Sequence, residues 1–194
     1  MENRVALYTF GIFRRPSADP VNDSFHARND SNLAAVARSA GFIARSGYDG
    51  DPGPASWGPA AYPRFYTGSD PHSPSTLSLW RDLESPLAFT YSGIHAEALA
   101  HGRDWFVKPV ASPLQKPAWP PYVLWWVAGD HVPDWCEAVQ RHEHLHDHGP
   151  SPRAFDWKTA FDAQGQPTAI DRDLVRRLSA LNLASQAGFS QAAG

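Results

Sequence analysis

The chain has 194 residues, of which 42% are hydrophobic and 19% charged, a composition that is typical of a globular protein and excludes a disordered one. The net charge of −3 and the scattered basic residues argue against a nucleic-acid-binding surface, and every apolar run is too short to span a bilayer. A single cysteine, Cys136, excludes an intrachain disulfide, and the N-terminus lacks the pattern of a signal peptide, so we expect one cytoplasmic domain over residues 1–194, with no membrane or nucleic-acid partner.

The N-terminal part predicts a strand, a helix and a second, short strand. Residues 5–13 (VALYTFGIF) are rich in β-formers and end before a proline, which indicates a strand. Residues 31–40 place apolar side chains at helical spacing, and Gly41 ends that helix. The following residues, FIARS (42–46), form a short extended segment.

A long loop and a hairpin follow. Residues 47–63 are rich in Gly and Pro, and a loop of this length in a compact domain is commonly functional or poorly ordered. RFYTG (64–68) and STLSLW (75–80) read as two strands of a hairpin, because the segment between them is polar and turn-like.

The second half of the chain begins with a capped helix. Ser85 and Pro86 are a typical helix start, and the helix is predicted to run to about Gly102. A proline-rich loop at 107–121 precedes YVLWWVA (122–128), the strongest strand prediction in the chain. The last predicted elements are a helix from Pro133 to about Asp147, a strand at 154–161, and a C-terminal helix from Arg172 to Leu183.

The order of these elements predicts an α+β fold. A βαββαβ order is that of the ferredoxin-like fold, an antiparallel sheet with helices on one face, here with a core at about 3–130 and an extension at 131–194. The strand YVLWWVA is apolar on both sides, so both of its faces should be buried. A second copy of the sheet would provide the cover and make a homodimer, or elements after residue 130 would provide part of it.

HEHLH at 142–146 matches the zinc-protease pattern, with His142, Glu143 and His146 in the required positions. Such a site also needs a third ligand and an open coordination position. The segment is polar nearly all round and lies just before Gly149, which is typical of a solvated helix end whose histidines suit the helix dipole. We therefore interpret HEHLH as a helix end that binds metal at most adventitiously.

The residues from Trp80 to His95 are the stronger candidate for a site. A strand ends at Trp80, and the capped helix that follows carries His95 on an otherwise apolar face. An imidazole in such a setting is either a core histidine with satisfied nitrogens or a ligand or acid–base group facing a cavity. In the second case the walls would be aromatic: Trp80, Tyr91, Trp125 and Trp126.

Several motifs taken together resemble a bacterial family of unannotated function: LYTFG (7–11), SLW (78–80), YSGIHAEAL (91–99), WF (105–106), LWW (124–126) and GPSPRAF (149–155). The resemblance covers most of residues 5–160. That family is placed in the dimeric α/β-barrel superfamily, which includes antibiotic biosynthesis monooxygenases. The resemblance therefore implies a ferredoxin-like subunit and a homodimer, and in that family the region of HEHLH looks like an ordinary helix end.

The stretch from Ser78 to His95 also resembles, more loosely, the heme-using members of that superfamily, such as heme-degrading monooxygenases and spheroidene monooxygenase. This resemblance implies a heme-dependent oxidoreductase for a small hydrophobic substrate, with His95 as the axial iron ligand and Trp80 against the porphyrin. Trp125 and Trp126 would complete the cofactor site, with Tyr91 near the reaction. Arg81 and Lys108 would pair with propionates, although solvated surface charges are the ordinary reading. The fifteen residues from Trp80 to His95 are a longer spacing than in the heme degraders.

Two other functions stay open. Other members of the superfamily work without a cofactor, and His95 would then move protons on a polyketide-like substrate in an aromatic cavity. The other alternative is a protein that binds or senses a small molecule without turnover.

If heme is bound, the distal groups of its site would come from the first strand, where Tyr8 and Thr9 point to opposite faces.

Overall fold

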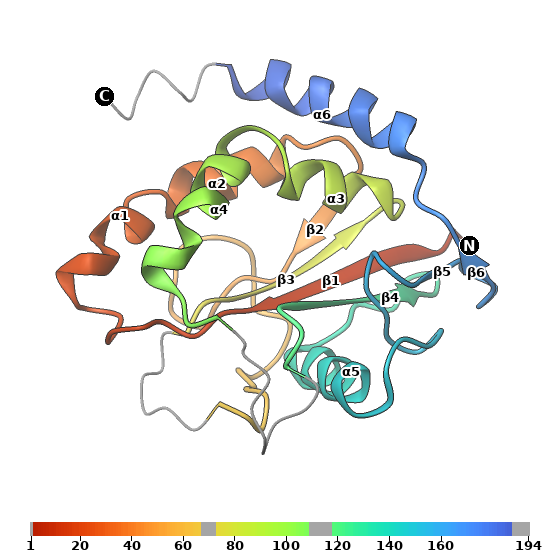
Figure 1. The fold of residues 1–194 in the computed structure, drawn as a ribbon, viewed down its shortest axis with the longest axis horizontal. Helices are drawn as coiled ribbons and strands as arrows, with labels where there is room; N and C mark the ends of the chain where they lie inside the picture. The colour runs from red at the N-terminus through yellow and green to blue at the C-terminus, as the bar shows by residue number, and fades with distance from the viewer. Residues whose placement is uncertain (1, 67–72, 109–117, 188–194) are drawn as a thin grey trace.

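Residues 2–66, 73–108 and 118–187 are described by the structure, a computed structural model of mixed α/β type. A four-stranded antiparallel sheet lies in the middle, with several helices on one side and one helix on the other (Figure 1). In chain order the elements are β1 (Arg4–Phe10), η1 (Pro20–Asn22), α1 (Asp23–His26), α2 (Asn29–Ala37), β2 (Phe42–Arg45), β3 (Ser75–Trp80), α3 (Glu84–Thr90), α4 (Gly93–Trp105), β4 (Tyr122–Val127), α5 (Trp135–His148), β5 (Ala160–Phe161), β6 (Pro167–Thr168) and α6 (Arg172–Gln186).

The strand order in the sheet is β2-β3-β1-β4, and each neighbouring pair is antiparallel. At one end Val5 pairs with Trp80 and Trp126, and at the other Thr9 pairs with Thr76 and Tyr122. Because side chains alternate along a strand, β1 sends Val5 and Leu7 to one face and Ala6 and Tyr8 to the other. The two faces therefore build two separate cores.

The first core lies between the sheet and the layer formed by α2, α3, α4 and α6 (Figure 1). Trp80, Leu87 and Phe89 are among its buried residues, and α3 packs along α6. This layer carries His95, the predicted site residue, in α4.

The second core lies under α5 and the segment 46–66. Leu124 and Trp125, neighbours on β4, are both 0% exposed although they face opposite cores, so the prediction that both faces of this strand are buried is confirmed. The cover is α5, which belongs to the elements after residue 130, and not a second sheet. The face through which a homodimer was expected is thus filled within one chain, and the homodimer stays a prediction.

The helix predicted from Ser85 to Gly102 is in fact two helices, α3 and α4. The helical conformation is interrupted at Tyr91–Ser92, and Gly93 adopts a positive φ of 57°, a conformation that favours glycine. Sequence periodicity missed the break because the apolar face continues on both sides of it. The break gives α4 its own direction.

Three other element predictions were changed by the structure. The strand at 5–13 ends at Phe10. Of the predicted hairpin strand 64–68, Arg64 and Phe65 form a turn and residues 67–68 lie outside the described residues. Strand β3 pairs with β1 and β2 instead. Only Ala160–Phe161 of the predicted strand 154–161 is a strand, although Phe155 exchanges two backbone hydrogen bonds with Leu124.

Across the described ranges, none of the helices combines the length and the apolar character that crossing a membrane requires.

Candidate functional site

His95 lies in the first turn of α4, and its ring is held in one orientation. Its Nδ1 is 3.0 Å from the backbone oxygen of Thr90, so Nδ1 carries the hydrogen and donates it. The ring also packs on Phe89, with centroids 4.7 Å apart. In the described ranges Nε2 has no partner, so its lone pair is available.

The surroundings keep this imidazole neutral. Burial lowers the pKa of His95 below its ordinary value and outweighs the bond to Thr90, which favours the charged form. The side chain nevertheless keeps part of its surface accessible.

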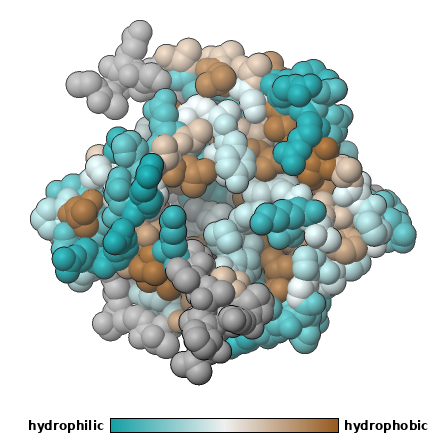
Figure 2. Space-filling view, in the orientation of Figure 1, coloured by the Kyte–Doolittle hydropathy of each residue, from teal (hydrophilic) through white to brown (hydrophobic). Residues whose placement is uncertain are grey.

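Figure 2 shows a hollow near the centre of the visible face. Helix α4 makes its main contacts with α2, α3 and α6. On the side of the sheet that faces α4, Thr9, Thr76 and Tyr122 keep accessible surface. The hydroxyls of Thr9 and Thr76 are hydrogen-bonded at 2.7 Å, so this end of the sheet offers polar groups below an apolar wall.

Tyr91 lies at the edge of the same area. It is 60% exposed, and it interacts electrostatically with the hydroxyl of Tyr122. Burial, then Asp156 and, more weakly, Tyr91 raise the pKa of Tyr122 to about 12, so that phenol is neutral at physiological pH. Phe89 and Tyr122 were not among the predicted site residues, because an isolated aromatic residue in a sequence reads as core.

Trp80 is on the same sheet face as His95 but does not touch it. It is 1% exposed, donates its Nε1 hydrogen to Ser78 at 2.9 Å, and has Phe89 as its neighbour at 5.7 Å. Phe89 packs against both Trp80 and His95. Trp80 supports the wall instead of forming its surface.

The other predicted cofactor residues are not brought to His95. Trp125 is on the opposite face, under α5, where it donates to Glu137 at 3.1 Å. Trp126 lies across Val5 from Trp80, on the same face of the sheet, and donates to the backbone oxygen of Phe161 at 2.7 Å. Arg81 is more than half exposed and pairs with Asp82 at 3.1 Å.

These positions allow a test of the predicted heme site. The axial ligand fits, because a neutral imidazole with its Nδ1 hydrogen bonded to a carbonyl presents Nε2 to a metal. The predicted walls do not fit, because Trp80 is only 1% exposed and the sheet separates Trp125 from His95. The donor nitrogen is present and the expected porphyrin contacts are not.

The interpretation of HEHLH as a solvated helix end is wrong for His142. This residue is 0% exposed and lies on the inner face of α5, together with Trp135, Ala138, Val139 and Leu145. Its Nε2 is 2.5 Å from the backbone oxygen of Pro120. Helical spacing from Trp135 could have identified it, since 135, 138, 139, 142 and 145 share one face.

Glu143 and His146 also have partners of their own. Glu143 accepts a hydrogen bond from the backbone of Arg64 at 2.7 Å, and His146 stacks on Trp119 at 3.7 Å. Within the part of the chain that the structure describes, no group of three or more His, Cys, Asp and Glu side chains is placed to hold a metal ion.

A surface depression of about 500 Å³ lies along the outer side of α5, lined by charged and polar residues that include His131, Glu137 and Arg141. Burial acts to raise the pKa of Glu137, but hydrogen bonds from His131 and Arg141 outweigh it and the pKa is lowered. Glu137 also accepts from Trp125, so it joins this surface to the second core.

The comparisons with known proteins give one match. A family model described as a domain of unknown function, DUF3291, matches residues 4–171. None of the curated proteins and none of the solved structures matches the chain. The match takes in the elements from β1 to β6.

Proposed function

We propose that this chain, which belongs to the DUF3291 family of domains of unknown function, is an enzyme that binds a small hydrophobic molecule in the hollow below α4 and uses His95 as its acid–base group. The observation that carries the proposal is the fixed, neutral imidazole. Its Nδ1 hydrogen is bonded to Thr90, and no described residue is hydrogen-bonded to its Nε2.

The chemistry follows from that tautomer. A neutral Nε2 accepts a proton from a weakly acidic C–H or O–H group of a bound molecule. In the imidazolium that forms, the Nδ1 hydrogen stays hydrogen-bonded to the Thr90 oxygen. This bond stabilises the positive charge until Nε2 returns its proton to the bound molecule. The lowered pKa of His95 keeps the base unprotonated at physiological pH.

The surroundings suit a substrate that is mostly apolar and carries few polar groups. Phe89 offers an aromatic wall next to His95, with Trp80 behind it. The hydroxyls of Thr9, Thr76 and Tyr122 offer hydrogen bonds from the sheet. In this proposal His95 acts on the substrate, Tyr91 contacts it from the edge, and Trp80 holds Phe89 in place.

We also propose a ferredoxin-like fold of the dimeric α/β-barrel type for the part before α5. The order β2-β3-β1-β4, the antiparallel pairing, and helices between β1 and β2 and between β3 and β4 support it. In this chain α5 lies where a barrel partner would cover the sheet.

Heme binding is a second candidate, favoured by one observation, the availability of Nε2 of His95 for a metal. Heme would bring iron chemistry and oxygen insertion, while Phe89 would have to move for a porphyrin to reach Trp80. Hemin titration distinguishes the two candidates. A Soret band that is lost in His95→Ala supports heme, and an unchanged hemin spectrum rules it out.

The acid–base proposal is tested first without a substrate. Two-dimensional ¹H–¹⁵N NMR of the histidine side chains should show His95 in the Nδ1–H form, with a pKa below that of an exposed histidine. A His95 whose pKa is not lowered from the ordinary histidine value would remove the basis of the proposal. His101, on the same helix and half-exposed, serves as the control position for substitution.

The second step is a screen of small hydrophobic carbonyl compounds and phenols, with thermal stabilisation and turnover as readouts. His95→Gln should keep the fold and lose turnover of any hit, whereas His101→Gln should keep both. A hit that is converted equally fast by His95→Gln places the chemistry elsewhere.

A further inference from the structure

A second group of polar atoms lies on the opposite side of the sheet, away from His95. The hydroxyl of Tyr8, Nδ1 of His142 and Nε1 of Trp119 are buried, and none of them has a hydrogen-bond partner within the described ranges. Tyr8 and His142 are 0% exposed and Trp119 is 7% exposed. Buried polar atoms in folded proteins are nearly always paired, so three unpaired ones require an explanation.

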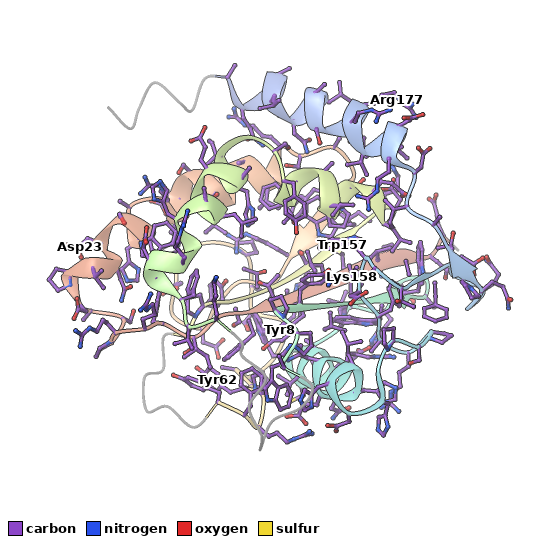
Figure 3. All side chains as sticks on the ribbon, in the orientation of Figure 1. Tyr8, Asp23, Tyr62, Trp157, Lys158 and Arg177 are labelled. Carbon is purple, nitrogen blue, oxygen red and sulfur yellow. The ribbon has the colours of Figure 1, made fainter. Side chains whose placement is uncertain are left out.

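The rings that carry these three atoms pack together in one cluster. The ring of His142 is 5.6 Å from that of Tyr8 and 5.9 Å from that of Trp119, centroid to centroid. They come from β1, from α5 and from the segment just before β4. Figure 3 shows Tyr8 on the α5 side of the sheet, with Tyr62 in the same part of the molecule.

Their protonation states follow from their surroundings. Nε2 of His142 donates to Pro120, so Nδ1 is an acceptor, and burial lowers the pKa of His142 to about 4, which keeps the ring neutral. Burial, followed by Tyr62 and Glu143, raises the pKa of Tyr8, so its hydroxyl keeps its hydrogen. Trp119 has only a donor to offer. The cluster therefore offers two donors and one acceptor.

A hydroxyl group is the complement of this set, because it has one hydrogen to donate and two lone pairs to accept. It would donate to Nδ1 of His142 and accept from Tyr8 and Trp119. A charged group would be unfavourable here, because burial already keeps both titratable members of the cluster neutral.

The walls of the cluster are aromatic. Phe65 lies 4.1 Å from Trp119, and Phe10 lies 5.5 Å from Phe65, centroid to centroid. The nearest ion pairs, those of Arg64 with Glu143 and Asp147, lie towards the surface. An aromatic ring that carries a hydroxyl group matches both the walls and the polar atoms.

We infer that Tyr8, His142 and Trp119 form a second binding site, which takes an uncharged phenol through its hydroxyl group. This site is independent of the function proposed for His95, because the sheet lies between the two.

The experiment compares phenol with toluene, which has the same ring without the hydroxyl, as ligands of the full chain. Phenol should raise the melting temperature and shift the ring resonances of His142, and toluene should do neither at the same concentration. Tyr8→Phe should weaken phenol binding about tenfold, the effect of one lost hydrogen bond in a buried site.

Tyr48→Phe is the matched control, because the Tyr48 hydroxyl lies on the same side of the sheet but donates to Ser75 at 2.6 Å. This variant should bind phenol like the original chain. The inference is overturned if phenol has no effect, if toluene binds equally well, or if Tyr8→Phe binds phenol unchanged. If only water occupies the cluster, neither probe will move the His142 resonances.

Discussion

His95 donates its Nδ1 hydrogen to the backbone oxygen of Thr90, and this bond joins the start of α4 to the end of α3. The last carbonyls of a helix have no partner within it, so the imidazole satisfies one that the break at Tyr91–Ser92 leaves free. The same break, with Gly93 in a left-handed conformation, places His95 against Phe89. The local fold and the candidate site therefore depend on one another.

The first prediction concerns Gly93. Its φ of 57° disfavours any residue with a Cβ, and a Cβ there would lie 2.0 Å from Oε1 of Gln186, which accepts from the backbone of Ile94. Gly93→Ala should lower the free energy of unfolding by about 2 kcal/mol, measured by urea titration, since strain and a lost hydrogen bond add. It should also shift the NMR signals of His95.

Gly50→Ala is its control. Gly50 has a φ of 84°, but in the described ranges no atom lies within 4 Å of its Cβ position. Gly50→Ala should lower the free energy of unfolding by about 1 kcal/mol, because only the backbone conformation is strained. Equal losses in the two variants would show that the contact between Gly93 and Gln186 does not support the start of α4.

The second prediction concerns the wall of the hollow. Phe89→Leu removes the ring that packs on His95 and should lower the free energy of unfolding by about 1–2 kcal/mol. With less burial, the pKa of His95 should rise towards its ordinary value, which an NMR titration measures. Phe155→Leu, in the same core and 0% exposed, should cost as much stability without moving that pKa. A His95 pKa that is the same in both variants would contradict the role given to Phe89.

Much of the fold was predictable because strands such as YVLWWVA carry strong local signals and appear where expected. The break between α3 and α4 was not, since it depends on the backbone of Gly93 and on Gln186, which is far away in the sequence. The order of the elements also could not say whether α5 or a second chain covers the sheet. That depended on the inner face of α5, whose apolar residues are interrupted by His142.

The candidate site was predictable in part for the same reason. His95 could be chosen as an imidazole on an apolar helix face, and the structure shows its ring half-buried and hydrogen-bonded to Thr90. Trp125 and Trp126 could not both line one site, because adjacent residues of a strand face opposite sides of the sheet. His142 was passed over because its neighbours in sequence are polar, whereas its neighbours in space are aromatic.

The third prediction is a pH dependence of stability that His142 causes. Its pKa in the folded chain is about 4, below the ordinary value of 6.5, so the unfolded chain binds the proton first as the pH falls. The contribution of His142 is complete above pH 6.5 and is lost between pH 6.5 and about 4, by about 3 kcal/mol. Urea titrations at pH 7 and pH 4.5 measure the loss.

His142→Gln is the variant that isolates this effect, because its amide still reaches towards Pro120 but does not titrate. It should be less stable than the original chain at pH 7, and the difference should shrink or reverse at pH 4.5. If both proteins lose the same stability between the two pH values, the acid sensitivity comes from other groups.

The last prediction concerns Glu137, which joins the outer surface of α5 to the buried indole of Trp125. Glu137→Ala should lower the free energy of unfolding by about 2–3 kcal/mol, because the Nε1 hydrogen of Trp125 would stay buried without an acceptor. Glu137→Gln keeps an oxygen for Trp125 and loses only the charge next to His131 and Arg141, so it should cost less, about 1 kcal/mol. Glu97→Ala, an exposed position on α4, should change stability by less than about 0.5 kcal/mol. Urea titrations of the three variants at pH 7 measure these losses, and the lowered pKa of Glu137 keeps its carboxylate ionised at that pH. Equal losses in the Ala and Gln variants would mean that the ion pairs of Glu137, and not its hydrogen bond with the indole, stabilise the fold.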